Sequence, residues 1–416
     1  MSKESKTMER EAQVKARAKE PWTARRVGDL ILNNALIIIM VIAVIYIAIV
    51  NKNFMKPASI INILAQTCAY LPVALGVGGC IVLTGTDLSA GRIVGLTACI
   101  SASLLQSVDA ASKMWVNLTP PNVILVLILA MVIGGAIGAF NGFFVAKFKL
   151  HPFIVTLAGM LTFRGLAWST LDGKTISPFP MEFTRFFNSY IPASGGATLT
   201  VSIIVGAVIC AMFVVMQLVT RASKAKKGYQ VDAVPWLVAK LVLIPAVVMW
   251  VFWLLGQDKG IPVILILLAV VVLVYNYFTS NTVPGRYLYA MGGNEKAARL
   301  SGVNTKRIQF FAYTNMGFLA SVAALVCVSR FNSAAPSAGT NYEMDAIAAC
   351  YIGGASAFGG VGKVGGAVIG AIFMGVLNNG MSILGIDQNW QRTVKGLVLL
   401  AAVIFDVMSK NRKQSA

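Results

Sequence analysis

The side chains best suited to chemistry inside this apolar chain lie between Thr84 and Arg92, in the segment TGTDLSAGR. The carboxylate of Asp87 and the hydroxyls of Thr86 and Ser89 interrupt a long apolar stretch there. Ionisable groups at membrane depth are costly and often mark a transport pathway, so we expect these three residues to line one. The alternative is a tight turn between two membrane spans, with Ser89 capping the following helix.

Three amide side chains, at Asn141, Asn378 and Asn379, also lie inside apolar segments. In one interpretation they line a polar pathway, and in the other they tie helices together through hydrogen bonds, which is the commoner role. No nucleophile–base pair or carboxylate pair with useful spacing occurs, so we expect no catalytic residue. A single His151 and six cysteines without a CxxC pair predict no metal site, and no cofactor is expected.

A second polar segment, residues 285–307, is also rich in basic side chains and lies between apolar stretches. Gly292 and Gly293 are expected to end the structural element that precedes them. Asn294 then suits the N-cap of a short helix. Glu295 falls in the first turn, where the helix dipole favours a negative charge, and Gly302 suits the C-terminal stop. We expect a short capped helix that another protein can hold, with an ordinary loop containing one helical turn as the alternative.

The elements that position these residues follow from the composition. Of 416 residues, 57% are hydrophobic and only 12% are charged, whereas a soluble domain carries about 25% charged residues. Apolar runs of about 20 residues predict membrane-spanning helices. The fold class is therefore all-α, a polytopic membrane protein with about twelve transmembrane segments (10–12), placed at 29–50, 60–83, 89–108, 122–146, 153–170, 199–219, 235–255, 261–279, 308–329, 344–357, 362–384 and 389–408.

The net charge of +19 predicts membrane orientation rather than nucleic-acid binding, because the basic residues cluster in alternate loops and at both chain ends. This places both termini in the cytoplasm, with tails at 1–28 and 409–416 around a transmembrane domain at 29–408. Glu343 and Asp345 fall in a predicted outer loop. Four basic residues fall inside predicted spans, where snorkelling or pairing is expected: Arg164, Lys240, Arg392 and Lys395.

An internal repeat links residues 134–139, GGAIGA, with residues 365–371, GGAVIGA. Each copy precedes an asparagine on the same span, and the two would run in opposite senses, as inverted repeats do. Chance similarity between Gly/Ala-rich spans is the alternative.

Three stretches carry a resemblance to a known family: TGTDLSAGR at 84–92, GGNEKAARLSGVN at 292–304 and YEMDAIAACYIGG at 342–354. They resemble the membrane-spanning permease subunit of bacterial ABC importers for sugars, most closely the galactose/methyl-galactoside type, with ribose and xylose types similar. The resemblance covers roughly residues 30–408. It implies a non-enzymatic transport subunit of the bacterial inner membrane that forms a homodimer with a second permease copy.

The resemblance also implies two other partners, a cytoplasmic ATPase with two nucleotide-binding domains and an extracytoplasmic sugar-binding protein. The segment at 292–302 is similar to the coupling helix that sits in a groove of the ATPase. The residues that match are Gly292, Gly293, Asn294, Glu295, Ala297, Ala298, Ser301 and Gly302.

One difference from the galactose permeases affects the prediction of which sugar is transported. Residues 199–260 look longer than in galactose permeases and add about two spans, a feature shared with xylose types. Galactose or methyl-galactoside is the main expectation, and xylose or ribose is the alternative. An alternative of another class is a secondary transporter that uses an ion gradient, with Asp87 as the ion-coupling carboxylate; a membrane scaffold without transport is the third.

Overall fold

The computed structural model describes residues 35–107, 113–115, 117–119, 121–192, 197–229 and 234–414, so the predicted tail at 1–28 lies outside the described residues. The chain divides into two compact units, one drawn from residues 1–52 and 195–260, the other from 53–194 and 261–416. The smaller unit holds three helices among its described residues, α3 (Ala35–Val50), α9 (Thr198–Lys226) and α10 (Val234–Gln257). The predicted extra spans at 199–260 thus correspond to α9 and α10.

The larger unit contains the rest of the chain that the structure describes. The short 3-10 helix η1 (Lys52–Met55) spans the boundary between the units. Two strands, β1 (Tyr190–Ile191) and β2 (Ile261–Pro262), pair antiparallel. The α-helices are α4 (Pro57–Val82), α5 (Ala90–Leu105), α6 (Val123–Phe148), α7 (Pro152–Leu171), α8 (Met181–Asn188), α11 (Val263–Asn281), α12 (Val283–Gly293), α13 (Glu295–Leu300), α14 (Thr305–Phe331), α15 (Tyr342–Ile352), α16 (Val364–Ile383) and α17 (Gln388–Gln414).

Each of the twelve predicted apolar segments contains a helix, which confirms the all-α polytopic prediction. Among the described residues, eight helices are at least 18 residues long and apolar enough to cross a membrane, and α3 and α5 are shorter apolar helices. The segment at 344–357 forms only the 11-residue α15, about half a span. At the C-terminus, α17 continues to Gln414, beyond the predicted boundary at 408.

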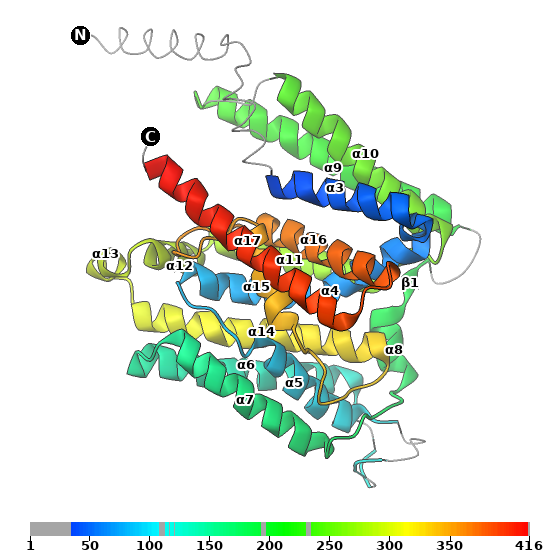
Figure 1. Ribbon diagram of the computed structural model, residues 1–416, viewed down its shortest axis with the longest axis vertical. Helices are drawn as coiled ribbons and strands as arrows, with labels where there is room; N and C mark the ends of the chain where they lie inside the picture. Colours follow the sequence, from blue (N-terminus) through cyan, green and yellow to red (C-terminus); the bar gives the residue numbers. More distant parts are fainter. Residues whose placement is uncertain are drawn as a thin grey trace. The chain divides into compact units, whose positions relative to one another are not determined.

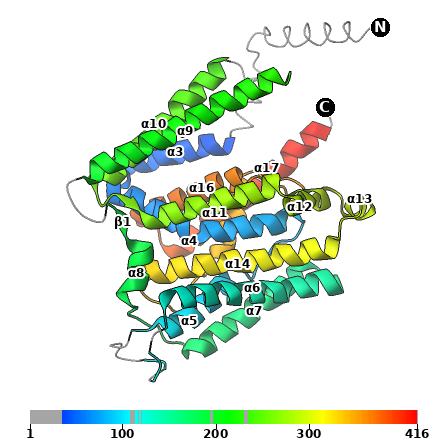
Figure 2. The same ribbon diagram turned by 180° about the vertical axis from the view of Figure 1, so that it is seen from behind.

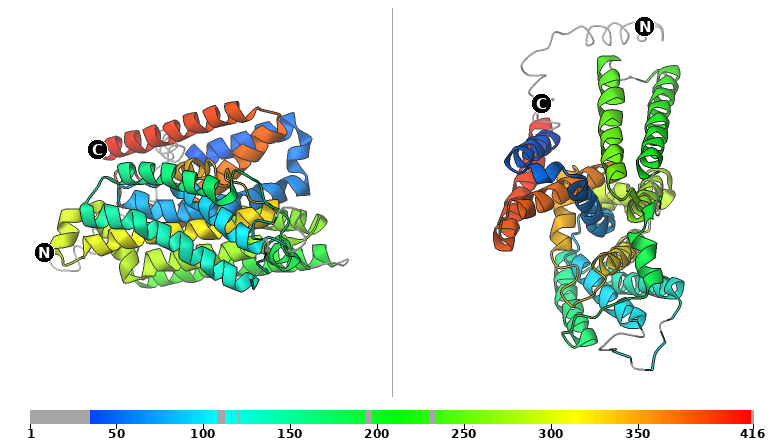
Figure 3. Two further views of the ribbon diagram at one scale, coloured as in Figure 1. Left: turned by 90° about the horizontal axis from the view of Figure 1, so that it is seen from below. Right: turned by 90° about the vertical axis from the view of Figure 1, so that its right-hand side faces the viewer.

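The long helices of the larger unit run roughly parallel or antiparallel, which gives the unit two ends (Figure 1, Figure 3). At the α8 end, Asn188 Nδ2 donates to the Ser329 carbonyl at 2.7 Å, and Ile176 pairs with Ala334. At the α13 end, the loop 353–363 meets the last turn of α4, where the Gly360 N–H donates to the Val82 carbonyl at 2.9 Å.

Helix α14 lies between α4 and α6 at the centre of the larger unit (Figure 1, Figure 2). Glycines make the α6–α14 contact close: a Cβ at Gly138 would meet the Tyr313 carbonyl and, at 2.9 Å, the Gly317 Cα. On α16, a Cβ at Gly370 would likewise meet the Ala349 carbonyl of α15. Both copies of the repeated glycine pattern therefore bring helix backbones together. The inverted repeat itself stays a prediction.

The α6–α14 contact gives a matched test of this packing. We expect Gly138→Val to destabilise the protein by about 1–3 kcal/mol, because the side chain would overpack a backbone contact. Gly135→Val is the control, since nothing lies within 4 Å of a Cβ at Gly135. Thermal unfolding of both variants in detergent measures the difference, and equal midpoints would contradict the proposed role of Gly138.

Candidate transport and coupling sites

The predicted capped helix is present. Asn294 is the N-cap of α13, and its side-chain oxygen accepts a hydrogen bond from the Ala297 N–H at 2.9 Å. Glu295 lies in the first turn, and Gly302, with φ +86°, follows the helix in the left-handed conformation that favours glycine. Of the eight residues expected to contact an ATPase, six are exposed, Gly292 is half-buried and Ala298 is buried.

The inner face of the α12–α13 segment packs on the bundle, and its outer face carries one exposed large apolar side chain. Ala298 and Val303 join a buried cluster with Val82, Leu288 and other residues. The side chain of Leu300 points the other way and is 88% exposed. The sequence analysis missed Leu300; the available signal was the one large apolar residue in an otherwise polar short helix.

Backbone contacts fix α12 to the rest of the α13 end. A Cβ at Gly292 would meet the Val82 carbonyl and, at 2.8 Å, the Gly360 nitrogen, so the three backbones touch. The Tyr289 hydroxyl donates to the Gly362 carbonyl at 2.8 Å. Helix α12 is therefore tied to both the last turn of α4 and the loop 353–363.

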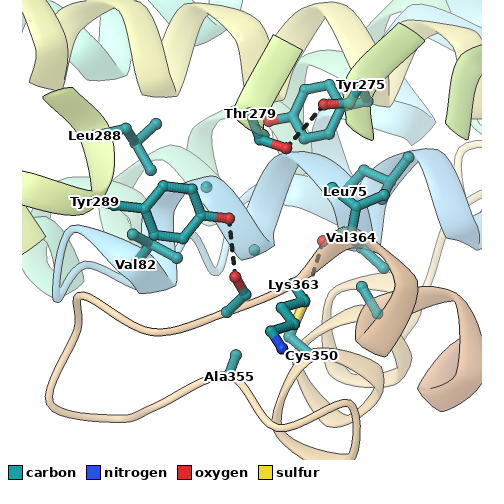
Figure 4. A pocket seen from close by; sticks show the side chains of 15 residues that line it. Leu75, Val82, Tyr275, Thr279, Leu288, Tyr289, Cys350, Ala355, Lys363 and Val364 are labelled. Carbon is teal, nitrogen blue, oxygen red and sulfur yellow. Dashed lines mark hydrogen bonds between the residues drawn. The ribbon is translucent and has the colours of Figure 1, made fainter. Parts of the chain in front are cut away.

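A pocket lies beside this junction, lined by α4, α11, α12, α15 and α16 and by the loop 353–363. In Figure 4 the Tyr289 ring reaches across it towards the loop, and Leu288 and Val82 flank the ring. Tyr275 and Thr279 line another part, with the Tyr275 hydroxyl accepting from Asn315 Nδ2 at 2.9 Å. The pocket is small, about 30 Å³, roughly the volume of one water molecule.

The residues at 84–92 form a buried connection between α4 and α5. Asp87 is fully buried, and its Oδ1 accepts from the Ser89 N–H at 2.8 Å and from the Ser89 hydroxyl at 2.6 Å. Asn141 Nδ2 of α6 donates to the Ser89 hydroxyl at 2.8 Å, and the Thr156 hydroxyl of α7 lies 3.3 Å from the Thr86 carbonyl. The predicted residues Thr86, Asp87, Ser89 and Asn141 therefore gather in one cluster.

The capping alternative is right about the position of Ser89 and wrong about the role of its side chain. Ser89 is the N-cap residue of α5, but its side chain makes no cap hydrogen bond and instead donates to Asp87. Asp87 lies in the connection between the two helices. In the part of the chain that the structure describes, Asp87 Oδ2, Asn141 Oδ1 and the Tyr313 hydroxyl find no hydrogen-bond partner.

The other two amides belong to a different cluster. Asn378 Nδ2 donates to Asp345 Oδ2 at 3.1 Å, and Asn379 Nδ2 donates to the Ser59 hydroxyl at 3.0 Å. No described hydrogen bond joins them to the Asp87 cluster, so the six expected pathway residues do not form one site. In each case the amide links two helices, as the tying interpretation expects.

The expectation that Asp345 and Glu343 lie in an outer loop is wrong. Both are buried in the first turn of α15. Lys395 Nζ of α17 lies 3.0 Å from Asp345 Oδ1 and 3.2 Å from Oδ2, which makes Lys395 a paired cation. The sequence indicated only that each charge needs a partner of opposite sign inside apolar segments, and it did not identify that partner.

Comparison with known proteins identifies the family. The family model described as "Branched-chain amino acid transport system / permease component" matches residues 59–403. The chain belongs to this permease family. Its members' description agrees with a transport subunit rather than an enzyme, as expected.

Individual relatives support the same family. The xylose transport system permease protein XylH of Escherichia coli K12 is 37% identical over 384 residues, covering 91% of this chain and 93% of that protein. XylH of Haemophilus influenzae is 35% identical over 377 residues, covering 91% and 96%. The ribose import permease protein RbsC of Haemophilus influenzae is 32% identical over 381 residues, covering 92% and 95%.

No solved structure matches this permease. The expected likeness to galactose permeases gains no support, since the relatives just named are xylose and ribose permeases. An ion-coupled secondary transporter gains none either.

The buried pair of the permease gives a second matched test. We expect Lys395→Met to destabilise the protein by about 3–5 kcal/mol, because it leaves the Asp345 carboxylate buried without its cation. The double variant Lys395→Met/Asp345→Asn should recover most of that stability, since no uncompensated charge remains.

The exposed pair Lys174–Asp172, at 3.2 Å with side chains 65% and 82% exposed, serves as the control. Lys174→Met should cost less than about 1 kcal/mol. Thermal unfolding in detergent measures all three variants. A double variant as unstable as Lys395→Met would show that the ion pair does not determine the loss.

Proposed function

We propose that this permease is the membrane-spanning subunit of an ABC importer for a pentose, xylose or ribose. The observation that carries the proposal is similarity along about nine-tenths of the chain to proteins named as xylose and ribose permeases. Xylose replaces galactose as the first candidate for two reasons. The xylose permeases show the higher identity among these relatives, and the chain carries the additional helices α9 and α10.

The proposed setting is the bacterial inner membrane, with both termini and the α13 end in the cytoplasm. The α13 end carries many basic side chains, as expected for the inner face. They are Lys147, Lys149, Arg286, Lys296, Arg299, Lys306, Arg307 and Lys363. The partners in this proposal are a second permease copy, a cytoplasmic ATPase with two nucleotide-binding domains and an extracytoplasmic sugar-binding protein at the α8 end.

Helix α13 is the proposed contact with the ATPase. Its exposed tip offers the apolar side chain of Leu300 together with Glu295, Ala297 and Ser301. An exposed apolar side chain surrounded by polar groups suits the centre of a protein contact. A displacement of α13 would pass through α12 to α4 and the loop 353–363, because backbone contacts join these elements.

The proposed pathway uses the buried and half-buried polar residues of both clusters. Thr86, Asp87, Ser89 and Asn141 flank the start of α5, and Asn378 and Asn379 lie on α16. A polar solute crossing the bundle needs such groups in place of its lost water.

The proposal is tested by purifying the tagged chain from its native membrane in mild detergent and identifying its companions by mass spectrometry. A stoichiometric ATPase with two nucleotide-binding domains is expected, and liposomes holding the complex, ATP and the binding protein should take up D-xylose or D-ribose. A chain that purifies alone and moves sugar under an ion gradient would contradict the proposal.

The coupling role gives a third prediction. Gly292→Ala should lower ATP-dependent sugar uptake about tenfold, because an overpacking penalty of about 1–3 kcal/mol would fall on the junction between α12, α4 and the loop. Gly365→Ala is the control, since Gly365 lies outside the expected ATPase contact and nothing lies within 4 Å of a Cβ there. Uptake and membrane insertion are measured for both. Normal uptake by Gly292→Ala would show that this junction does not transmit the ATPase movement.

A further inference from the structure

The span that contains α15 is broken, and its first half is a polar loop inside the bundle. Ala334 pairs with Ile176 at the α8 end. Five residues later, the Gly339 carbonyl packs against Gly91 in the first turn of α5. The contact is so close that a Cβ at Gly91 would overlap the carbonyl oxygen. Since α5 ends near the α8 end, Gly339 lies beside the opposite end of α5, deeper in the bundle than Ala334 but within the roughly 17 Å that five residues can reach. Non-helical backbone at such depth needs protein or a water-filled cavity beside it.

Such a cavity lies beside this loop. It has a volume of about 390 Å³, within the range of about 300–1,000 Å³ that small-molecule sites occupy. Every side chain that lines it is polar or charged. The loop contributes Ser337, Thr340 and Asn341, and one face of α17 contributes Gln388, Gln391, Arg392 and Lys395. We call it the α17 pocket.

Polar contacts hold the walls of the α17 pocket to α5 and α15, and through α15 to α16. The Thr340 hydroxyl accepts from Arg92 of α5 at 2.9 Å and donates to the Ser337 carbonyl at 2.5 Å. Lys395 is paired with Asp345 of α15, which also accepts from Asn378 of α16. The pocket is therefore preorganised, and the charge of Lys395 is balanced.

Other lining groups are left for a ligand. In the part of the chain that the structure describes, the side chains of Asn341, Gln388 and Arg392 make no hydrogen bond. Amides both donate and accept, as sugar hydroxyls do, and the guanidinium donates to hydroxyl or ring oxygens. No aromatic face lines the pocket, so binding would rest on hydrogen bonds alone. Weak binding suits a station on a transport route, where the solute must also leave.

We propose that the α17 pocket binds the hydroxyl groups of a neutral monosaccharide on its way through the permease. The inference rests on the proposed function and adds to it a place and a residue set, because none of Ser337, Thr340, Asn341, Gln388, Gln391, Arg392 and Lys395 was expected to line the pathway. Broken spans form the substrate sites of many transporters, and the α15 span has this form; the first turns of α17 place the mouth of the pocket at the α8 end.

Direct binding is tested by cysteine protection in the full complex, held in lipid nanodiscs. Ser337→Cys places an exposed thiol at the pocket without removing a side chain assigned to the sugar, whereas five of the six native cysteines are buried and wild-type labelling gives the background. A hydrophilic methanethiosulfonate reagent should label this variant, and saturating D-xylose or D-ribose should slow labelling several-fold. Glycine betaine at equal osmolarity is the control and should not.

Transport variants give an independent measurement. Gln388→Leu and Arg392→Gln should lower the amount of sugar moved per ATP hydrolysed about tenfold, while ATP hydrolysis stimulated by the loaded binding protein stays normal. A purely structural defect would lower both quantities together. Thr393→Val is the matched control, because Thr393 is exposed on the same helix and does not line the pocket.

The outcomes separate the two proposals. Absence of sugar uptake by the wild-type complex would overturn the proposed function. Wild-type uptake of D-xylose or D-ribose with unprotected labelling and normal sugar-to-ATP ratios in both variants would overturn the α17 pocket alone. Protection by D-glucuronate but by neither neutral sugar would show an anion site at Arg392 and would also overturn the inference.

Discussion

Polar groups deep in this helical bundle must find partners inside the protein, because lipid offers none. Two networks meet most of that constraint in the larger unit, with Asp87 Oδ2 and Asn141 Oδ1 left without a hydrogen-bond partner among the described residues. One joins Asp87 and Ser89 to Asn141, and so fixes the start of α5 against α6. The other joins Asp345, Lys395 and Asn378, and so holds α15, α16 and α17 together. The positions of the short helices α5 and α15 depend on these bonds, because neither is long enough to be anchored at both membrane surfaces.

Close glycine contacts fix the positions of the long helices, as the polar networks fix the positions of α5 and α15. At Gly138 and Gly317 the backbones of α6 and α14 touch, and at Gly292 the backbone of α12 touches α4 and the loop 353–363. Backbone contacts leave no flexible side chain between two elements. A displacement of one element is therefore passed to the other rather than absorbed, which suits the proposed coupling role of α12 and α13.

The sequence was informative wherever local chemistry determines structure. Apolar runs located all twelve main helices, and the Asn294 cap and Gly302 turn formed as expected. Sequence patterns could not predict the long-range pairs. Lys395 lies 50 residues from Asp345, and no local pattern indicates that the two meet. The same holds for the separation of Asn378 from the Asp87 cluster. The choice of galactose failed for a different reason, since motifs shared by the whole family do not distinguish its sugars.

Helix α15 joins the two regions on which the proposals rest. Its first turn carries Asp345, which binds the Lys395 side chain of the α17 pocket. Its last turn leads directly into the loop 353–363, which contacts α12 through Gly360 and Gly362. Eleven helical residues span about 16 Å and behave as one rigid piece. A shift of α12 imposed by an ATPase would therefore reach the proposed sugar pocket through α15, without an additional moving element.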